Sequence, residues 1–252
     1  MSEIKLREYL KSTVYPGRGI IIGQSAGGEN IVAAYFIMGR SENSRNRVFE
    51  KTADGIRTKA FDESKLTDPS LVIYSPIRKY KNNIIVTNGD QTDTIYDFLS
   101  GEKSFEGALR TRTFEPDPPI LTPRISGIVQ ILPPPPTDGT PLKEGGKETF
   151  NYRLSILKSG NGNKDHALRY FYEYETPEPG KGHFIHTYKH NAEVPPSFEG
   201  EPKKVEISGD IEDFSEIIWG SLNDDFKVSL YAAYIDKKTG EIKEDKIINK
   251  NI

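Results

Sequence analysis

Short apolar runs separated by tight polar turns recur along most of this chain, and they constrain its fold more than any other feature. Residues 19–23, 31–38, 84–86 and 151–158 are runs of this kind. Their length and composition are typical of strands. Because turns join most runs directly, the strands are expected to pair as antiparallel hairpins.

The same pattern predicts about ten strands and three or four helices. Residues 71–74 and 83–87 are expected to pair as a hairpin, and residues 56–61 to form an edge strand. Helices are expected at residues 3–12, after the turn at residues 88–90, and at residues 104–111 and 210–222. We therefore predict an α+β fold with layered, mainly antiparallel sheets, and not a parallel doubly wound fold.

Composition narrows the class of protein. The chain has 252 residues, a net charge of −3 and no cysteine, which excludes disulfides, thiolate metal sites and a cysteine nucleophile. The small acidic excess argues against a nucleic-acid surface. No signal peptide or membrane-length apolar run is visible, so a cytoplasmic location is expected. The Pro- and Gly-rich stretch near residues 133–148 could pass for a linker, but we predict an insertion in a single domain spanning residues 1–252.

Three arginines, Arg40, Arg45 and Arg47, lie close together where an apolar run ends. A polar segment of this kind often forms a solvated loop. Guanidinium groups also suit phosphate and carboxylate oxygens, so the alternative is an oxyanion clamp.

Polar residues follow the run at residues 84–86 more densely than a turn requires. Asn88 and Gly89 can turn the chain sharply, and Asp90 is expected only to cap the helix that follows. Thr92, Asp93 and Thr94 exceed what one cap needs, so a ligand is a second explanation.

Two further groups could carry chemistry. Glu115 and Asp117 lie in a proline-rich bend and Tyr74 ends an apolar run, so a carboxylate and a phenol meeting in one cleft could perform acid–base catalysis. A structural hydrogen bond is the commoner fate of such groups. His183, His186 and His190 have metal-like spacing only on a helix, and here the flanking residues favour a strand, so no metal site is expected.

Several of these residues together resemble a known family. The segment NGDQTDTI at residues 88–95 is similar to the Asn-Gly-x-x-Thr-Asp-Thr-Ile motif of the archaeal-type IMP cyclohydrolases. Further similar segments, in the same order, are Tyr15-x-Gly17-Arg18, GRS at 39–41, NR at 46–47, Tyr74, Ile77-Arg78 and TPRI at 122–125. The similarity is strongest over residues 15–131. Beyond it, Thr187-Tyr188 and the helix near residue 210 keep the order.

The resemblance implies an Ntn-hydrolase-like, four-layer αββα sandwich of two mainly antiparallel sheets. It also implies closure of 5-formamidoimidazole-4-carboxamide ribonucleotide to IMP with loss of water, a step of purine biosynthesis that needs no cofactor. The implied catalytic residues are Tyr74, Glu115 and Arg47. The implied substrate-binding residues are Arg18, Arg40, Asn88, Thr92, Asp93, Thr94 and Arg124. Arg124 could equally be a structural partner of Asp93.

Two departures leave other functions open. Fourteen residues precede Tyr15 and no processed nucleophile is visible, so the fold is expected without the Ntn-hydrolase mechanism. A non-catalytic purine-nucleotide-binding protein and, less favoured, an amide hydrolase are the alternatives. The aromatic run at residues 167–174 is compatible with a homo-oligomer and equally with a core strand.

Overall fold

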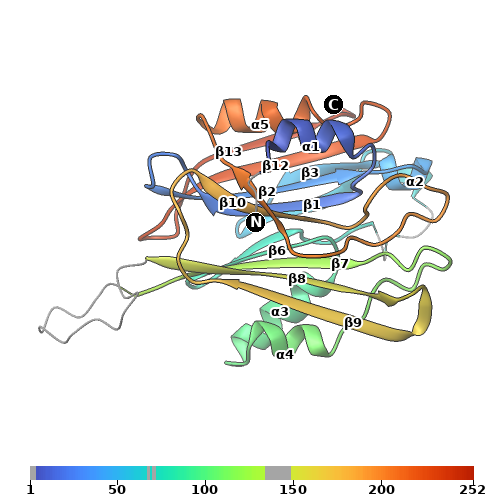
Figure 1. The fold of residues 1–252 in the computed structure, drawn as a ribbon, viewed down its shortest axis with the longest axis horizontal. Coiled ribbons are helices and arrows are strands. Elements are labelled where there is room, and N and C mark those ends of the chain that lie inside the picture. The colour runs from blue at the N-terminus through green and yellow to red at the C-terminus, as the bar shows by residue number, and fades with distance from the viewer. Residues whose placement is uncertain (1–3, 67–68, 70–71, 134–148) are drawn as a thin grey trace, which may run out of the picture.

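The computed structural model describes residues 4–66, 69, 72–133 and 149–252. Two antiparallel sheets lie face to face with helices on their outer faces (Figure 1). The first sheet contains β11 (Lys203–Glu206), β10 (Lys181–His186), β1 (Arg18–Gln24), β2 (Asn30–Met38), β12 (Lys227–Asp236) and β13 (Ile242–Asn249), in that order. The second contains β3 (Arg47–Lys51), β4 (Gly55–Ala60), β5 (Ile77–Tyr80), β6 (Asn83–Thr87), β7 (Arg124–Ile131), β8 (Phe150–Gly160) and β9 (Asn163–Tyr174).

Helices complete two outer layers. The helices are α1 (Leu6–Ser12), α2 (Glu42–Arg45), α3 (Gln91–Ser100), α4 (Phe105–Arg110) and α5 (Ile211–Trp219), with a short 3-10 turn η1 (Glu63–Lys65). α1 and α5 cover the first sheet, and α3 and α4 cover the second (Figure 1). No helix in the described part of the chain has the length and apolarity to cross a bilayer.

The central strand β1 is apolar along most of its length because both of its faces are buried. Ile20 and Ile22 point into the core between the sheets, whereas Ile21 points into the core beneath α1 and α5. Side chains alternate along a strand, so a strand covered on both faces reads as an unbroken apolar run. The four-layer αββα sandwich that the resemblance implied is confirmed.

Two predictions about the second sheet are wrong. Within residues 72–74 the chain is not a strand, and β6 pairs with β5 instead. The backbone N–H of Tyr74 donates to the hydroxyl of Thr58 at 2.9 Å. The Thr58 side chain thus takes the place of the backbone carbonyl that would accept this bond in a regular β-ladder. Moreover, β4 is an interior strand, because β3 pairs outside it and forms the edge.

The predicted insertion near residues 133–148 lies, from residue 134 onward, outside the described residues. Its role in the fold therefore stays a prediction.

Candidate functional site

Polar side chains from five separate segments meet at one end of the sandwich. Arg18 begins β1, Tyr188 follows β10, Arg47 begins β3, and Arg124 begins β7. Antiparallel pairing places the start of one strand beside the end of its neighbour, as in the pairs Gly19 with His186 and Thr87 with Ser126. The bend that carries Glu115 joins them between α4 and β7. The strand ends therefore bring together residues that are far apart in the sequence.

Glu115 is the acidic group of this site. It is only 8% exposed, and its backbone N–H donates to the carbonyl of Thr122 at 2.9 Å, which fixes the bend. Burial raises the pKa of the Glu115 carboxyl from its ordinary value of 4.5 to about 7, against the lowering effect of Arg124, Arg18 and Arg47. No hydrogen bond to this carboxylate exists within the described chain. A carboxyl with this pKa can take up and release protons at neutral pH.

Arg47 supplies a buried cation. Its side chain is 1% exposed, and Nε donates to the carbonyl of Ser44 at 3.0 Å. Nη1 is buried without a hydrogen-bond partner among the described residues. Burial and the nearby charge of Arg18 lower the pKa of Arg47. An unpaired buried donor is costly, so this atom is suited to an acceptor on a ligand. The solvated-loop alternative is wrong for Arg47, although Arg45 is exposed.

Two buried tyrosines adjoin this guanidinium. The hydroxyls of Tyr35, on β2, and Tyr74 lie 2.7 Å apart. Both phenols act electrostatically on Arg18 and on Arg47, so all four groups share one region. Tyr74 is predicted as a site residue from the sequence, whereas Tyr35 is not. The only sequence signal for Tyr35 is a phenol within an otherwise apolar run, IVAAYFIM at residues 31–38.

The Tyr-x-Gly-Arg segment positions Arg18. Gly17 has φ of +78°, and a Cβ there would lie 2.5 Å from the Tyr188 ring, so only glycine fits. Tyr15 stacks on Tyr188 with ring centroids 5.7 Å apart. The backbone N–H of Arg18 donates to the Thr187 hydroxyl at 3.1 Å, and its Nη1 donates to the carbonyl of Met38 at 3.0 Å. The other guanidinium hydrogens remain available for an anion.

Asp90 links the helix start to two arginines. Its carboxylate accepts from Arg124 Nη1 at 2.6 Å and from Arg112 Nη2 at 2.5 Å, and it makes no capping bond to α3. The prediction that Asp90 only caps the helix is therefore wrong. The alternative pairing of Arg124 with Asp93 is also wrong, since Arg124 pairs with Asp90 and with Gln91 at 2.7 Å.

Other residues of the NGDQTDTI segment make structural hydrogen bonds. Asn88 donates to the carbonyl of Pro123 and accepts from the amide of Ile125. Thr92 is buried and donates to the carbonyl of Gly89 at 3.0 Å. The Asn88 bonds hold the turn against the start of β7, and the Thr92 bond closes the turn itself. A ligand-binding role for Asn88 and Thr92 stays a prediction.

Two of three further predicted binding residues, Asp93 and Arg40, are engaged with partners outside the groups described above. Asp93 is exposed and pairs with Arg78 at 2.8 Å, and Thr94 follows it on the partly exposed side of α3. Arg40 donates to the carbonyls of Ala192 and Glu193. Thus Arg40 is engaged by a loop, and all three remain untested as ligand-binding residues.

Sequence reasoning also missed a hydrogen-bonded chain beside Glu115. Asp117 accepts from the backbone N–H and the hydroxyl of Thr122 at 2.7 and 2.5 Å. The Thr122 oxygen is 2.7 Å from the Tyr188 hydroxyl. Since Thr122 has one hydroxyl hydrogen and gives it to a carboxylate, Tyr188 must donate to Thr122. The negative charge of Asp117 also raises the pKa of Glu115.

The histidines do not form a cluster. His183 and His186 lie three apart on β10, where Nδ1 of His183 contacts the Tyr152 hydroxyl at 2.6 Å and Nε2 of His186 contacts that of Tyr9 at 2.8 Å. Burial lowers the pKa of His186 to about 3, so it stays neutral. The described residues contain no group of three or more His, Asp or Glu able to hold a metal ion.

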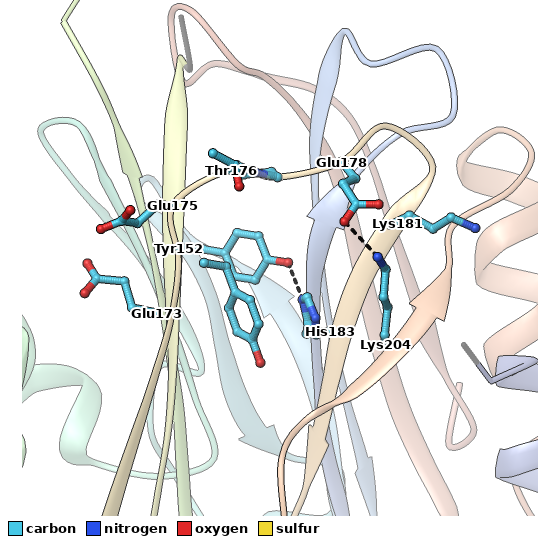
Figure 2. Close-up of a pocket in the computed structure, with 10 residues that line it drawn as sticks. Tyr152, Glu173, Glu175, Thr176, Glu178, Lys181, His183 and Lys204 are labelled. Atoms are coloured by element: carbon cyan, nitrogen blue, oxygen red, sulfur yellow. Dashed lines mark hydrogen bonds and ion pairs between the residues drawn. The ribbon is translucent and has the colours of Figure 1, made fainter. Parts of the chain in front are cut away.

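A cavity of about 450 Å³ lies at the opposite end of the sandwich, beside the start of β10 (Figure 2). Its rings stack on one another, with Tyr174 and His183 centroids 3.7 Å apart. Of its charged groups, Glu178 pairs with Lys204 at 2.7 Å (Figure 2). These stacked rings and this ion pair point to no particular ligand, whereas the Glu115 end gathers a carboxyl of raised pKa and several arginines, so it is the stronger candidate.

Comparison with known proteins identifies a family. A sequence model of the IMP cyclohydrolase-like protein family matches residues 15–239, a range that includes both the Glu115 end and the cavity at the opposite end. No curated protein sequence matches the chain.

Two solved structures of Anbu from Hyphomicrobium sp. strain MC1 show weak similarity. A mutant form has 10% identity and a TM-score of 0.38, and a second structure has 13% identity and a TM-score of 0.36. Each comparison covers 93% of this chain and 88% of the other. Similarity this low supports no functional argument.

Proposed function

Because this chain belongs to the IMP cyclohydrolase-like family, we propose that it closes 5-formamidoimidazole-4-carboxamide ribonucleotide to IMP. The observation that carries the proposal is Glu115, a buried carboxyl with a pKa of about 7 among Arg124, Arg18 and Arg47. Perturbed carboxyls among convergent cations are typical of catalytic sites.

The reaction sets the tasks of the site. The carboxamide nitrogen forms a bond to the formyl carbon, and the formyl oxygen becomes an alkoxide in the tetrahedral intermediate. The carboxamide and formamido nitrogens then each lose one proton, and these protons leave with the formyl oxygen as water. No electrons are transferred, so the closure requires no redox cofactor.

Glu115 suits the transfer of both protons, one after the other. Its ionised form takes a proton first from the attacking carboxamide nitrogen and then from the formamido nitrogen, and each time its protonated form passes that proton to the formyl oxygen, which leaves as water. A pKa of about 7 keeps both forms populated at neutral pH. We assign stabilisation of the alkoxide to Arg47 Nη1 and the Tyr74 hydroxyl, because donors in a buried site act strongly on developing charge.

The arginines suit the 5′-phosphate. Arg18 donates one guanidinium hydrogen to the carbonyl of Met38, and its other N–H groups can donate to a ligand. A phosphate monoester accepts several charge-assisted hydrogen bonds. Arg40 would need to leave its loop carbonyls to join it. Anchoring the phosphate would hold the two reacting groups in near-attack geometry.

Ultraviolet detection of IMP formed from the formamido ribonucleotide tests the proposal. We expect turnover by the wild-type protein, loss of turnover in Glu115→Gln, and full activity in a control, Glu216→Gln, on the exposed face of α5. A fully active Glu115→Gln would remove the site assignment. A wild-type protein that binds IMP without turnover would favour the non-catalytic nucleotide-binding function.

A further inference from the structure

β2 carries a single hydroxyl into the core between the sheets. Tyr35 is 0% exposed and shares its strand face with Ala33 and Ile37. A phenylalanine would fill nearly the same volume, so packing alone does not explain the phenol. The Tyr35 hydroxyl lies 2.7 Å from that of Tyr74, which comes from the segment before β5.

The direction of the hydrogen bond between the Tyr35 and Tyr74 hydroxyls follows from the positions available to their two hydrogens. Two hydroxyls carry two hydrogens, and only one lies in the bond between them. Arg18 and Arg47 adjoin both phenols, but a guanidinium only donates and cannot accept the second hydrogen. Tyr35 is fully enclosed, whereas Tyr74 is 6% exposed. If Tyr35 donates to Tyr74 and Tyr74 directs its own hydrogen into the site, no buried hydroxyl hydrogen is left without an acceptor.

The electrostatics of Tyr35 agree with its acting as the donor. Burial and the neighbouring Tyr74 phenol raise the pKa of Tyr35 well above its ordinary value of 10.0, against the lowering effect of Arg18 and Arg47. Tyr35 therefore keeps its hydrogen at every pH at which the protein is expected to work.

We propose that Tyr35 is a positioning residue that holds Tyr74 as a hydrogen-bond donor. In this arrangement, Tyr74 and the unpaired Nη1 of Arg47 together bind an oxygen that develops negative charge, the formyl oxygen of the substrate. The choice of this oxygen rests on the proposed cyclohydrolase function. The direction of the hydrogen bond does not, because it follows from the protein alone.

A double-mutant cycle on turnover tests the role. We expect Tyr35→Phe to lower kcat on the order of tenfold with KM little changed, as for loss of one oriented hydrogen bond. We expect Tyr35→Phe to have no further effect in a Tyr74→Phe background, since no donor is left to orient. An equal loss in both backgrounds would mean that Tyr35 acts only through packing, and would overturn the proposal.

Tyr152→Phe is the matched control. Tyr152 is 2% exposed and also loses one hydroxyl contact, to His183, but it lies at the opposite end of the sandwich. We expect this variant to lose thermal stability and to keep its kcat. A similar fall in kcat for Tyr152→Phe would show that any buried phenol matters equally, which also contradicts the proposal.

Thermal unfolding without substrate separates this proposal from the proposed function. If Tyr35 is the donor, Tyr74→Phe leaves the buried Tyr35 hydroxyl hydrogen without an acceptor. The Tm of Tyr74→Phe should therefore fall below that of Tyr35→Phe, and the Tm of the double variant should be higher than that of Tyr74→Phe. The reverse order would show that Tyr74 donates to Tyr35 and would refute the inference. A wild-type protein that forms no IMP would refute the function alone, because the unfolding comparison would still decide the direction.

Discussion

Replacing Glu115 by glutamine should make the protein inactive and, at alkaline pH, more stable. The structure holds this carboxyl 8% exposed beside Asp117, and burial raises its pKa to about 7. Ionising it in the folded protein therefore costs free energy that the unfolded chain does not incur. Glutamine has nearly the same shape and cannot ionise, so the variant avoids this cost.

The sign and size of this change in stability follow from the pKa of Glu115 in the unfolded chain and in the folded protein. Below the ordinary value of 4.5 the carboxyl is protonated in both states and the cost is absent. As the pH rises from 4.5 to about 7, the unfolded chain ionises first, and the free energy of unfolding of the wild type falls. At about 1.36 kcal/mol for each pKa unit, the full loss is about 3 kcal/mol, reached above pH ~7.

Urea unfolding of both proteins at about pH 5 and about pH 8 measures this difference. We expect Glu115→Gln to gain about 2 to 3 kcal/mol relative to the wild type between these pH values. Glu216→Gln, on the exposed face of α5, should show no comparable gain. A Glu115→Gln variant that is less stable than the wild type at about pH 8 would refute the buried, pKa-raised description of this carboxyl.

Three further predictions concern the groups around Glu115. Asp117→Asn should move the midpoint of the pH dependence of kcat/KM below pH ~7, because the charge of Asp117 raises the pKa of Glu115; an unchanged or higher midpoint would contradict this. Gly89→Ala should lower kcat/KM at least tenfold and lower the Tm, because its Cβ would lie 2.7 Å from the Arg124 guanidinium and from the Gln91 amide oxygen. The control is Gly101→Ala, whose Cβ would meet no atom closer than 3.5 Å, and equal effects of the two substitutions would contradict the crowding argument. Arg47→Met should lower kcat about tenfold or more, because it removes a donor to the alkoxide, while costing little stability in urea, because the charge that it removes is buried and incompletely paired. An unchanged kcat would exclude contact between Arg47 and the formyl oxygen.

Regular elements were the most predictable part of the fold. The strands at residues 19–23 and 31–38 and the helix at 104–111 appear as β1, β2 and α4, because alternation, turn residues and a Ser104 cap act over a few residues. The strand expected at residues 71–74 failed for a tertiary reason. There Thr58, distant in the sequence, takes the hydrogen bond of Tyr74.

The site divides in the same way. At the level of the sequence, the family resemblance implied that Tyr74, Glu115, Arg18 and Arg47 belong to one site, and residues alone suggested only that Glu115 and Tyr74 could meet in a cleft. The sequence could not determine that Arg124 pairs with Asp90 and not with Asp93, because two residues three apart at a helix start lie on similar faces and their spacing does not distinguish them. Nor could it determine the pKa of Glu115 or the contact between Tyr35 and Tyr74. Those depend on burial and on distances between segments, which only the packing of the two sheets sets.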